Sequence, residues 1–259
     1  MVNVYLRETM YDALEDNSLL LLDKGVTCVN GSSLGPLKKA RLPLEVPEED
    51  LLAVRERFRQ WVTAFNSPCV QTVHGVVDEV ASEHKLLSYR SKELAQAVTD
   101  SFAQGELSLY QRRDHLTRLA LLDEVREEFS FRPELTRQNR YVSRDYGSHE
   151  RLFQRVLSIS QECESKKSWF KEHDTDNQAD EQLVAAALDH SRYYGSAGLI
   201  TTDKDLDNIL RDYQQEQEVL GSVSVYRFKP KVLVTSVYES SNREVSNQEL
   251  VGTTGRIAS

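Results

Sequence analysis

The clearest hydrophobic pattern in the first third of the chain is the short, unbroken apolar run in SLLLLD at 18–23. A run of this length between polar residues is typical of a strand that is buried on both faces. Residues 47–65 begin with proline and three acids and then repeat apolar positions at helical spacing, which predicts an amphipathic helix. Residues 69–84 start with a β-like apolar stretch and continue with a helical pattern, which predicts a strand leading into a helix.

The last third of the chain alternates between the same two patterns. Residues 179–195 predict a helix that ends at Gly195, residues 198–202 a strand, and residues 205–216 a second helix. One or two late strands are expected over 222–238. Because strands that alternate with helices usually form parallel sheets covered by helices, we expect an α/β fold with a mainly parallel sheet flanked by helices.

The middle of the chain has a different character. Residues 85–170 are strongly charged, follow a helical pattern and contain a single proline, which predicts a helical insertion or subdomain. We therefore divide the chain into a first part of the α/β domain, the insertion, a second part of the α/β domain and a polar tail that we expect to be flexible. These four segments are 1–84, 85–170, 171–239 and 240–259.

Composition narrows the class of protein. With 259 residues, 39% of them hydrophobic, the chain can bury a substantial core. No apolar run reaches the roughly 18 residues of a membrane helix, and the N-terminus carries acids where a secretory signal would be basic and then apolar. We therefore expect a cytoplasmic protein without a membrane partner. Its three cysteines are widely separated and its histidines show no paired spacing, so neither a disulfide framework nor a zinc site is expected.

Acidic residues follow the predicted strands. Asp23 comes after the first apolar run and Asp203 after the strand at 198–202, and the carboxyl ends of parallel strands meet at one edge of a sheet. On a helical wheel, Asp180 shares a face with the apolar residues three, four and seven positions later, so it needs a polar partner. The chain has a net charge of −9, which disfavours non-specific coating of nucleic acid but leaves room for a local basic groove.

Each of these acids also has a structural explanation. Asp203 could cap the helix that follows it, and Asp205 and Asp207 would favour the positive end of the helix dipole. Asp180 is likewise an acid in a first helical turn, and Asp23 could be an ordinary turn residue. Periodicity does not choose among three further acids beside the valine stripe, which are Asp78, Glu79 and Glu83.

Two motifs together resemble a known family. ADEQLVAAAL followed by LITTDKDL is similar to the second half of a PIN-domain nuclease, in which an aspartate opens an alanine-rich helix and a strand ends in Thr-x-Asp-x-Asp. The family's first motif, an apolar strand ending in Asp, resembles LLLLD at Asp23, and its second, a valine-rich turn reaching a glutamate, resembles GVVDEV at Glu79. The likeness covers 18–34, 69–84 and 176–237. Because the family usually continues with Thr and a small polar residue where this chain has Lys24 and Gly25, Asn30 is an alternative to Asp23.

The resemblance implies a PIN-like fold with a helical insertion and a metal-dependent endoribonuclease, that is, a hydrolase of RNA phosphodiesters. Physical chemistry agrees, since two carboxylates about 4 Å apart repel by about 4 kcal/mol at an effective dielectric constant near 20. Converging acids therefore need a cation, and Mg²⁺ or Mn²⁺ prefers oxygen ligands. The residues that the resemblance assigns to metal binding and catalysis are Asp23, Glu79, Asp180 and Asp203, with Asp205 as a further ligand or hydrogen-bond acceptor. Thr201 would contact a phosphate or hold Asp23 in place.

A stretch rich in arginine is the candidate contact with RNA. Arg137, Arg140 and Arg144 would share one helical face, and Tyr141 lies between them and could stack on an unpaired base. A solvated face with internal ion pairs is the alternative. Two other functions also remain open: a non-catalytic PIN scaffold that binds RNA or protein, in which Lys24 replaces the cation, and a toxin inhibited by a protein partner.

Overall fold

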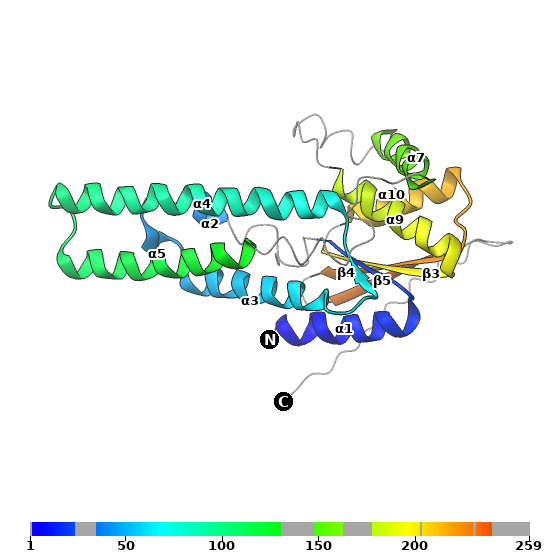
Figure 1. Cartoon of the computed structure of the whole chain (residues 1–259), viewed down its shortest axis with the longest axis horizontal. Helices are drawn as coiled ribbons and strands as arrows, with labels where there is room; N and C mark the ends of the chain where they lie inside the picture. Colours follow the sequence, from blue (N-terminus) through cyan, green and yellow to red (C-terminus); the bar gives the residue numbers. More distant parts are fainter. Residues whose placement is uncertain are drawn as a thin grey trace. The chain divides into compact units, whose positions relative to one another are not determined.

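The structure, a computed structural model, describes residues 2–23, 35–130, 148–162, 178–202, 204–229 and 232–239. The chain separates into two compact units (Figure 1). The sheet unit consists of Met1–Val26, Ser67–Val76 and Gln138–Ser259, and the helical unit of Thr27–Asn66 and Val77–Arg137. Each unit is described by itself below.

The sheet unit contains a five-stranded sheet with the order β2-β1-β3-β4-β5. The first four strands in this order run parallel, and β5 pairs antiparallel with β4. This sheet confirms the expected α/β class with a mainly parallel sheet. The strands are β1 (Leu20–Leu22), β2 (Val70–Gln71), β3 (Ser196–Thr201), β4 (Ser222–Lys229) and β5 (Val232–Glu239).

Helices of the same unit lie on both faces of the sheet (Figure 1). The helix α9 (Ala179–Tyr194) is buried on most sides because its sequence is rich in alanine and leucine, and it ends at Gly195, whose φ of +90° suits glycine. It packs beside α7 (Ser148–Glu162) and α10 (Asp205–Glu216), and α1 (Val2–Asp16) lies on the opposite face of the sheet. The helices predicted over 179–195 and 205–216 are thus confirmed.

The helical unit contains α2 (Gly35–Lys39), a short 3-10 helix η2 (Pro43–Glu45), α3 (Glu48–Ala64) and α5 (Leu109–Phe129). It also contains most of α4 (His74–Ala103), which starts in the sheet unit and passes into the helical unit at Val77. The predicted helix at 47–65 corresponds to α3, and α5 begins with a reciprocal capping box between Ser108 and Gln111.

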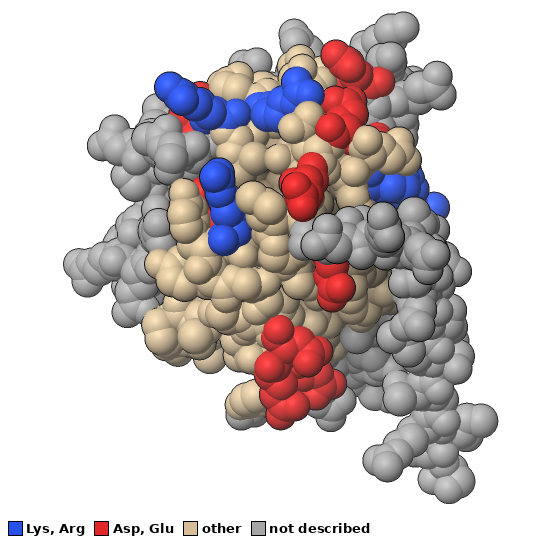
Figure 2. Space-filling model, turned by 90° about the vertical axis from the view of Figure 1, so that its right-hand side faces the viewer, with Lys and Arg blue, Asp and Glu red and all other residues tan. Residues whose placement is uncertain are grey.

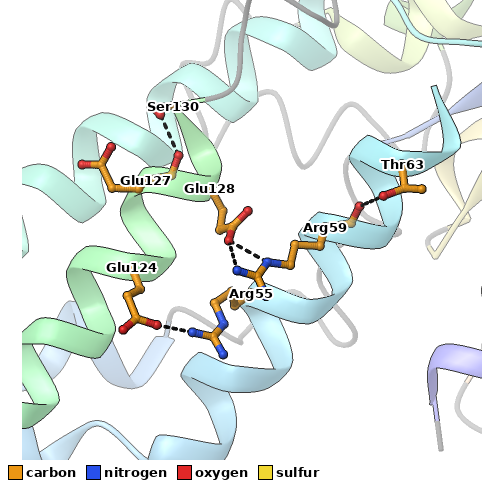
Figure 3. A network of polar contacts seen from close by, with 7 residues as sticks. All are labelled: Arg55, Arg59, Thr63, Glu124, Glu127, Glu128 and Ser130. Atoms are coloured by element: carbon orange, nitrogen blue, oxygen red, sulfur yellow. Dashed lines mark hydrogen bonds and ion pairs between the residues drawn. The ribbon is translucent and has the colours of Figure 1, made fainter. Parts of the chain in front are cut away.

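The helices α3 and α5 hold together through an aromatic core and a row of ion pairs. Phe58 and Phe129 are fully buried and stack with ring centroids 4.0 Å apart. Figure 3 shows the polar side of this contact, where Arg59 Nε donates to Glu128 Oε1 at 2.6 Å and Arg55 pairs with Glu124. The stacked rings exclude water, whereas the ion pairs lie at the rim.

The boundaries of the units differ from the four predicted segments. The helical unit includes residues 27–66, and α7, from the predicted insertion, belongs to the sheet unit. The predicted tail at 240–259 lies outside the described residues. None of the helices in the described part of the chain is both long and apolar enough to cross a lipid bilayer.

Candidate active site at the carboxyl edge of the sheet

Asp23 lies where β1 ends and is held there by the neighbouring strand. Its side chain is buried, with 5% of the residue exposed, and its backbone N–H donates to Ile200 O at 3.0 Å. Thr201, the last residue of β3, is fully buried and its Oγ1 donates to Asp23 Oδ2 at 2.8 Å. The Asp23 carboxylate is therefore fixed at the carboxyl edge of the sheet, and the contact from Thr201 is one of the two roles considered for that threonine.

Thr72 extends this arrangement to the third strand. It directly follows β2, is fully buried, and its Oγ1 donates to Leu22 O at 2.8 Å. The neighbouring parallel strands β2, β1 and β3 thus each end in a polar residue. Hydrogen bonds from Thr72 and Thr201 link the ends of these strands. Thr72 was not among the residues predicted for the site. The signal that the sequence offered was a threonine at the end of a short strand that leads into a helix.

The first turn of α9 lies at the same edge. Gly75, three residues after Thr72, donates its backbone N–H to Gln182 Oε1 at 2.7 Å. A Cβ atom on Gly75 would lie 2.8 Å from Ala179 Cα, so the start of α9 approaches this glycine closely. Asp180 follows Ala179 directly, and α9 therefore brings the Asp180 backbone to the edge that carries Asp23.

The acid buried most deeply in this turn is Glu181. It is 1% exposed and its Oε1 accepts a hydrogen bond of 2.5 Å from Ser160 Oγ of α7, whereas Asp180 is half-buried. We expected Asp180 to lie on the buried face of the helix, but the fully buried acid is its neighbour Glu181. Because α9 is covered on nearly all sides, the Glu181 carboxylate is buried and is hydrogen-bonded within the protein by Ser160. Asp180 keeps part of its surface accessible.

The start of α10 contributes two further acids. Asp205 is the first helical residue and is half-buried, while Asp207 is 8% exposed and its Oδ2 lies 3.0 Å from Arg227 Nη1. Tyr238 Oη donates to the backbone oxygen of Asp207 at 3.0 Å. Burial, and next the charge of Asp207, raises the pKa of Tyr238 far above its usual value, so the phenol stays protonated and can donate.

The remaining predicted residues lie in the helical unit or outside the described residues. Glu79 is half-buried on α4 in the part that belongs to the helical unit. The others lie outside the described residues: Asn30, Asp203 and the candidate RNA contacts Arg137, Arg140, Tyr141 and Arg144. For these residues the assignments stay predictions.

The donor chemistry of the edge suits a hard cation. Asp23, Asp180 and Asp205 offer carboxylate oxygens, which are the ligands that Mg²⁺ and Mn²⁺ prefer. Within the described ranges, no group of three or more His, Cys, Asp or Glu side chains is arranged to hold a metal ion. The predicted ligand set also includes Asp203, which those ranges omit.

Charged side chains on the surface bear on where a nucleic acid could bind. Figure 2 shows one face of the molecule, on which Lys and Arg side chains form scattered groups and a compact acidic group lies at the lower edge. Among the described residues visible there, the basic side chains do not join into a continuous band.

No family model, curated protein or solved structure matches this chain.

Proposed function

We propose that the protein is a PIN-like, metal-dependent endoribonuclease whose active site lies at the carboxyl edge of the sheet. The observation that carries this proposal is the buried Asp23 carboxylate, fixed by Thr201 at the ends of two adjoining parallel strands. Open α/β sheets place their ligands at this edge. The first turns of α9 and α10, which carry Asp180 and Asp205, begin on the carboxyl side of the same sheet.

Asp23, Asp180 and Asp203 would hold Mg²⁺ or Mn²⁺, with Asp205 as a further ligand. Such an ion supplies charge stabilisation and an activated water for phosphodiester hydrolysis. The chain itself contributes to the orientation, because Thr201 donates a hydrogen bond to one oxygen of the Asp23 carboxylate. Glu79 is assigned to the site by the family resemblance alone, whereas the proposal rests on the acids of the sheet unit.

Cleavage of structured and unstructured RNA with Mg²⁺ or Mn²⁺ tests the proposal. We expect the wild type to cleave, and Asp23→Asn, Asp180→Asn and Asp203→Asn each to lose at least about a hundredfold in rate, since each removes a ligand charge. Glu218→Gln is the matched control, because this exposed glutamate lies at the opposite, amino-terminal side of β4. Cleavage by the aspartate variants at the control's rate would remove these residues from the mechanism.

A further inference from the structure

Among the described residues, no side chain next to the start of α10 caps the helix. Lys204 occupies the N-cap position and makes no side-chain hydrogen bond to the helix end, where Ser, Thr, Asp or Asn would normally accept one. The position of this first turn matters because it carries Asp205 and follows the loop from β3. Contacts from other elements of the fold help to fix it.

Those contacts come from β4 and β5. Asp207 is buried in the first turn, and its carboxylate pairs with Arg227 of β4 at 3.0 Å. Arg227 is the register partner of Thr201, so the two side chains leave the sheet on the same face. Tyr238 of β5 donates to the Asp207 backbone oxygen at 3.0 Å and approaches Asp207 Oδ1 at 3.3 Å. Two strands thus hold one helical turn.

The chemistry of this network favours position over stability. A buried ion pair generally adds little net stability compared with apolar side chains of similar volume, because both charges lose their hydration. Arg227 Nε is also buried and has no hydrogen-bond partner among the described residues, which is a further cost. What the pair does supply is a fixed orientation of the start of α10 relative to the sheet.

We propose that Arg227, acting through Asp207 and supported by Tyr238, is a positioning residue that sets the first turn of α10 and thereby Asp205 at the candidate metal site. The consequence for metal binding rests on the proposed function. The positioning of the turn is independent of it and can be measured separately.

The central variant is Asp207→Leu combined with Arg227→Met, which removes both charges and leaves neither unpaired. Hydrogen exchange of the amides in residues 208–211, which donate to the carbonyl oxygens of the first turn, should become about tenfold faster, because the turn opens locally. The Mn²⁺ concentration for half-maximal RNA cleavage should rise about tenfold, as is usual when a group that orients a ligand is lost, while KM for RNA stays unchanged. The single variant Arg227→Lys keeps the charge opposite Asp207. Its Mn²⁺ concentration for half-maximal RNA cleavage should therefore stay close to that of the wild type.

Two comparisons keep the test decisive. Tyr238→Phe removes one hydroxyl and should also speed exchange in the first turn, which covers the case in which the double variant does not fold. Exchanging both members of the Arg155–Glu216 pair for glutamine should change neither readout, since that 3.4 Å pair lies exposed at the other end of α10. Unchanged exchange at residues 208–211 in the folded variants overturns the proposal. Faster exchange in a protein whose wild type neither binds Mn²⁺ nor cleaves RNA upholds the positioning role and rejects the nuclease.

Discussion

The hydroxyl of Thr201 and the carboxylate of Asp23 lie 2.8 Å apart although 178 positions separate them in the chain. Both residues are buried, so the carboxylate depends on this donor more than an exposed one would. Replacing Thr201 by valine keeps the shape and removes the donor. We expect the free energy of unfolding to fall by about 1–3 kcal/mol, the usual cost of removing a hydrogen-bond partner from a buried charged group.

Urea denaturation measures this loss, and Thr99→Val is the control. Thr99 is exposed and its hydroxyl donates to Ala95 O within the same helix, so this change should cost less than about 0.5 kcal/mol. Equal stability of the Thr201 and Thr99 variants would show that the contact between Thr201 and Asp23 is weak in solution.

Gly75→Ala should destabilise the protein even though Gly75 lies in a helix, where alanine is normally favoured. The added Cβ would lie 2.8 Å from Ala179 Cα, which is backbone and cannot move without shifting α9. Overpacking of this kind costs about 1–3 kcal/mol, which exceeds the gain of about 1 kcal/mol in helix propensity. Thermal unfolding measures the balance, and Gln96→Ala on the exposed side of α4 should be neutral or stabilising. A rise in Tm for Gly75→Ala would contradict the close approach of α9.

The contact between α3 and α5 should depend on its rings far more than on its ion pairs. Phe129→Ala removes a fully buried ring and should cost about 3–5 kcal/mol of unfolding free energy. Glu128→Gln removes the partner of an exposed arginine and should cost much less, and that cost should shrink further as salt is added. Denaturant unfolding of both variants at two salt concentrations checks the order. A larger loss for Glu128→Gln would overturn it.

His115 should make the stability of the helical unit depend on pH. Burial lowers the pKa of His115 below its usual 6.5, outweighing the nearby carboxylates of Asp114 and Glu45, which raise it. The unfolded chain therefore binds this proton more readily, and the free energy of unfolding should fall as pH drops below about 6.5, by at most about 1.4 kcal/mol per pH unit. The neutral ring also accepts a 3.4 Å hydrogen bond from the Leu44 N–H, which protonation would remove.

Urea unfolding between about pH 7 and about pH 5 tests this sign. The wild type should lose stability across that interval, and His115→Gln should show a flatter profile because glutamine does not titrate. Parallel profiles for the two proteins would place the origin of the pH dependence elsewhere.

Elements with a strong local pattern were predictable from the sequence. The helix expected over 205–216 is α10, because its acidic start and its buried stripe of Leu206, Ile209, Leu210 and Tyr213 both mark it. The strand expected over 18–23 is confirmed over Leu20–Leu22 as β1, and Ser18, Leu19 and Asp23 lie outside it. The helix α1 was not predicted from the sequence.

Choices that depend on tertiary partners could not be predicted. Asp180 and Glu181 differ by one step around α9, and a helix that is buried on nearly all sides gives the helical wheel no exposed face for reference. Asp207 was interpreted as an acid that favours the helix dipole. Its burial against Arg227 and Tyr238 depends on strands that come later in the chain, and no local pattern records such a pairing.

The division of the chain into units sets an order of events during synthesis. All residues of the helical unit have been made once the ribosome has passed Arg137. The sheet must wait, since β1 pairs with β3, whose residues 196–201 are made much later. Domains generally fold as they emerge, so the helical unit can fold first, while Leu20–Leu22 stay unpaired on the β3 side. During that interval the nascent chain exposes a strongly apolar strand, and binding of this segment by a chaperone would protect it from aggregation.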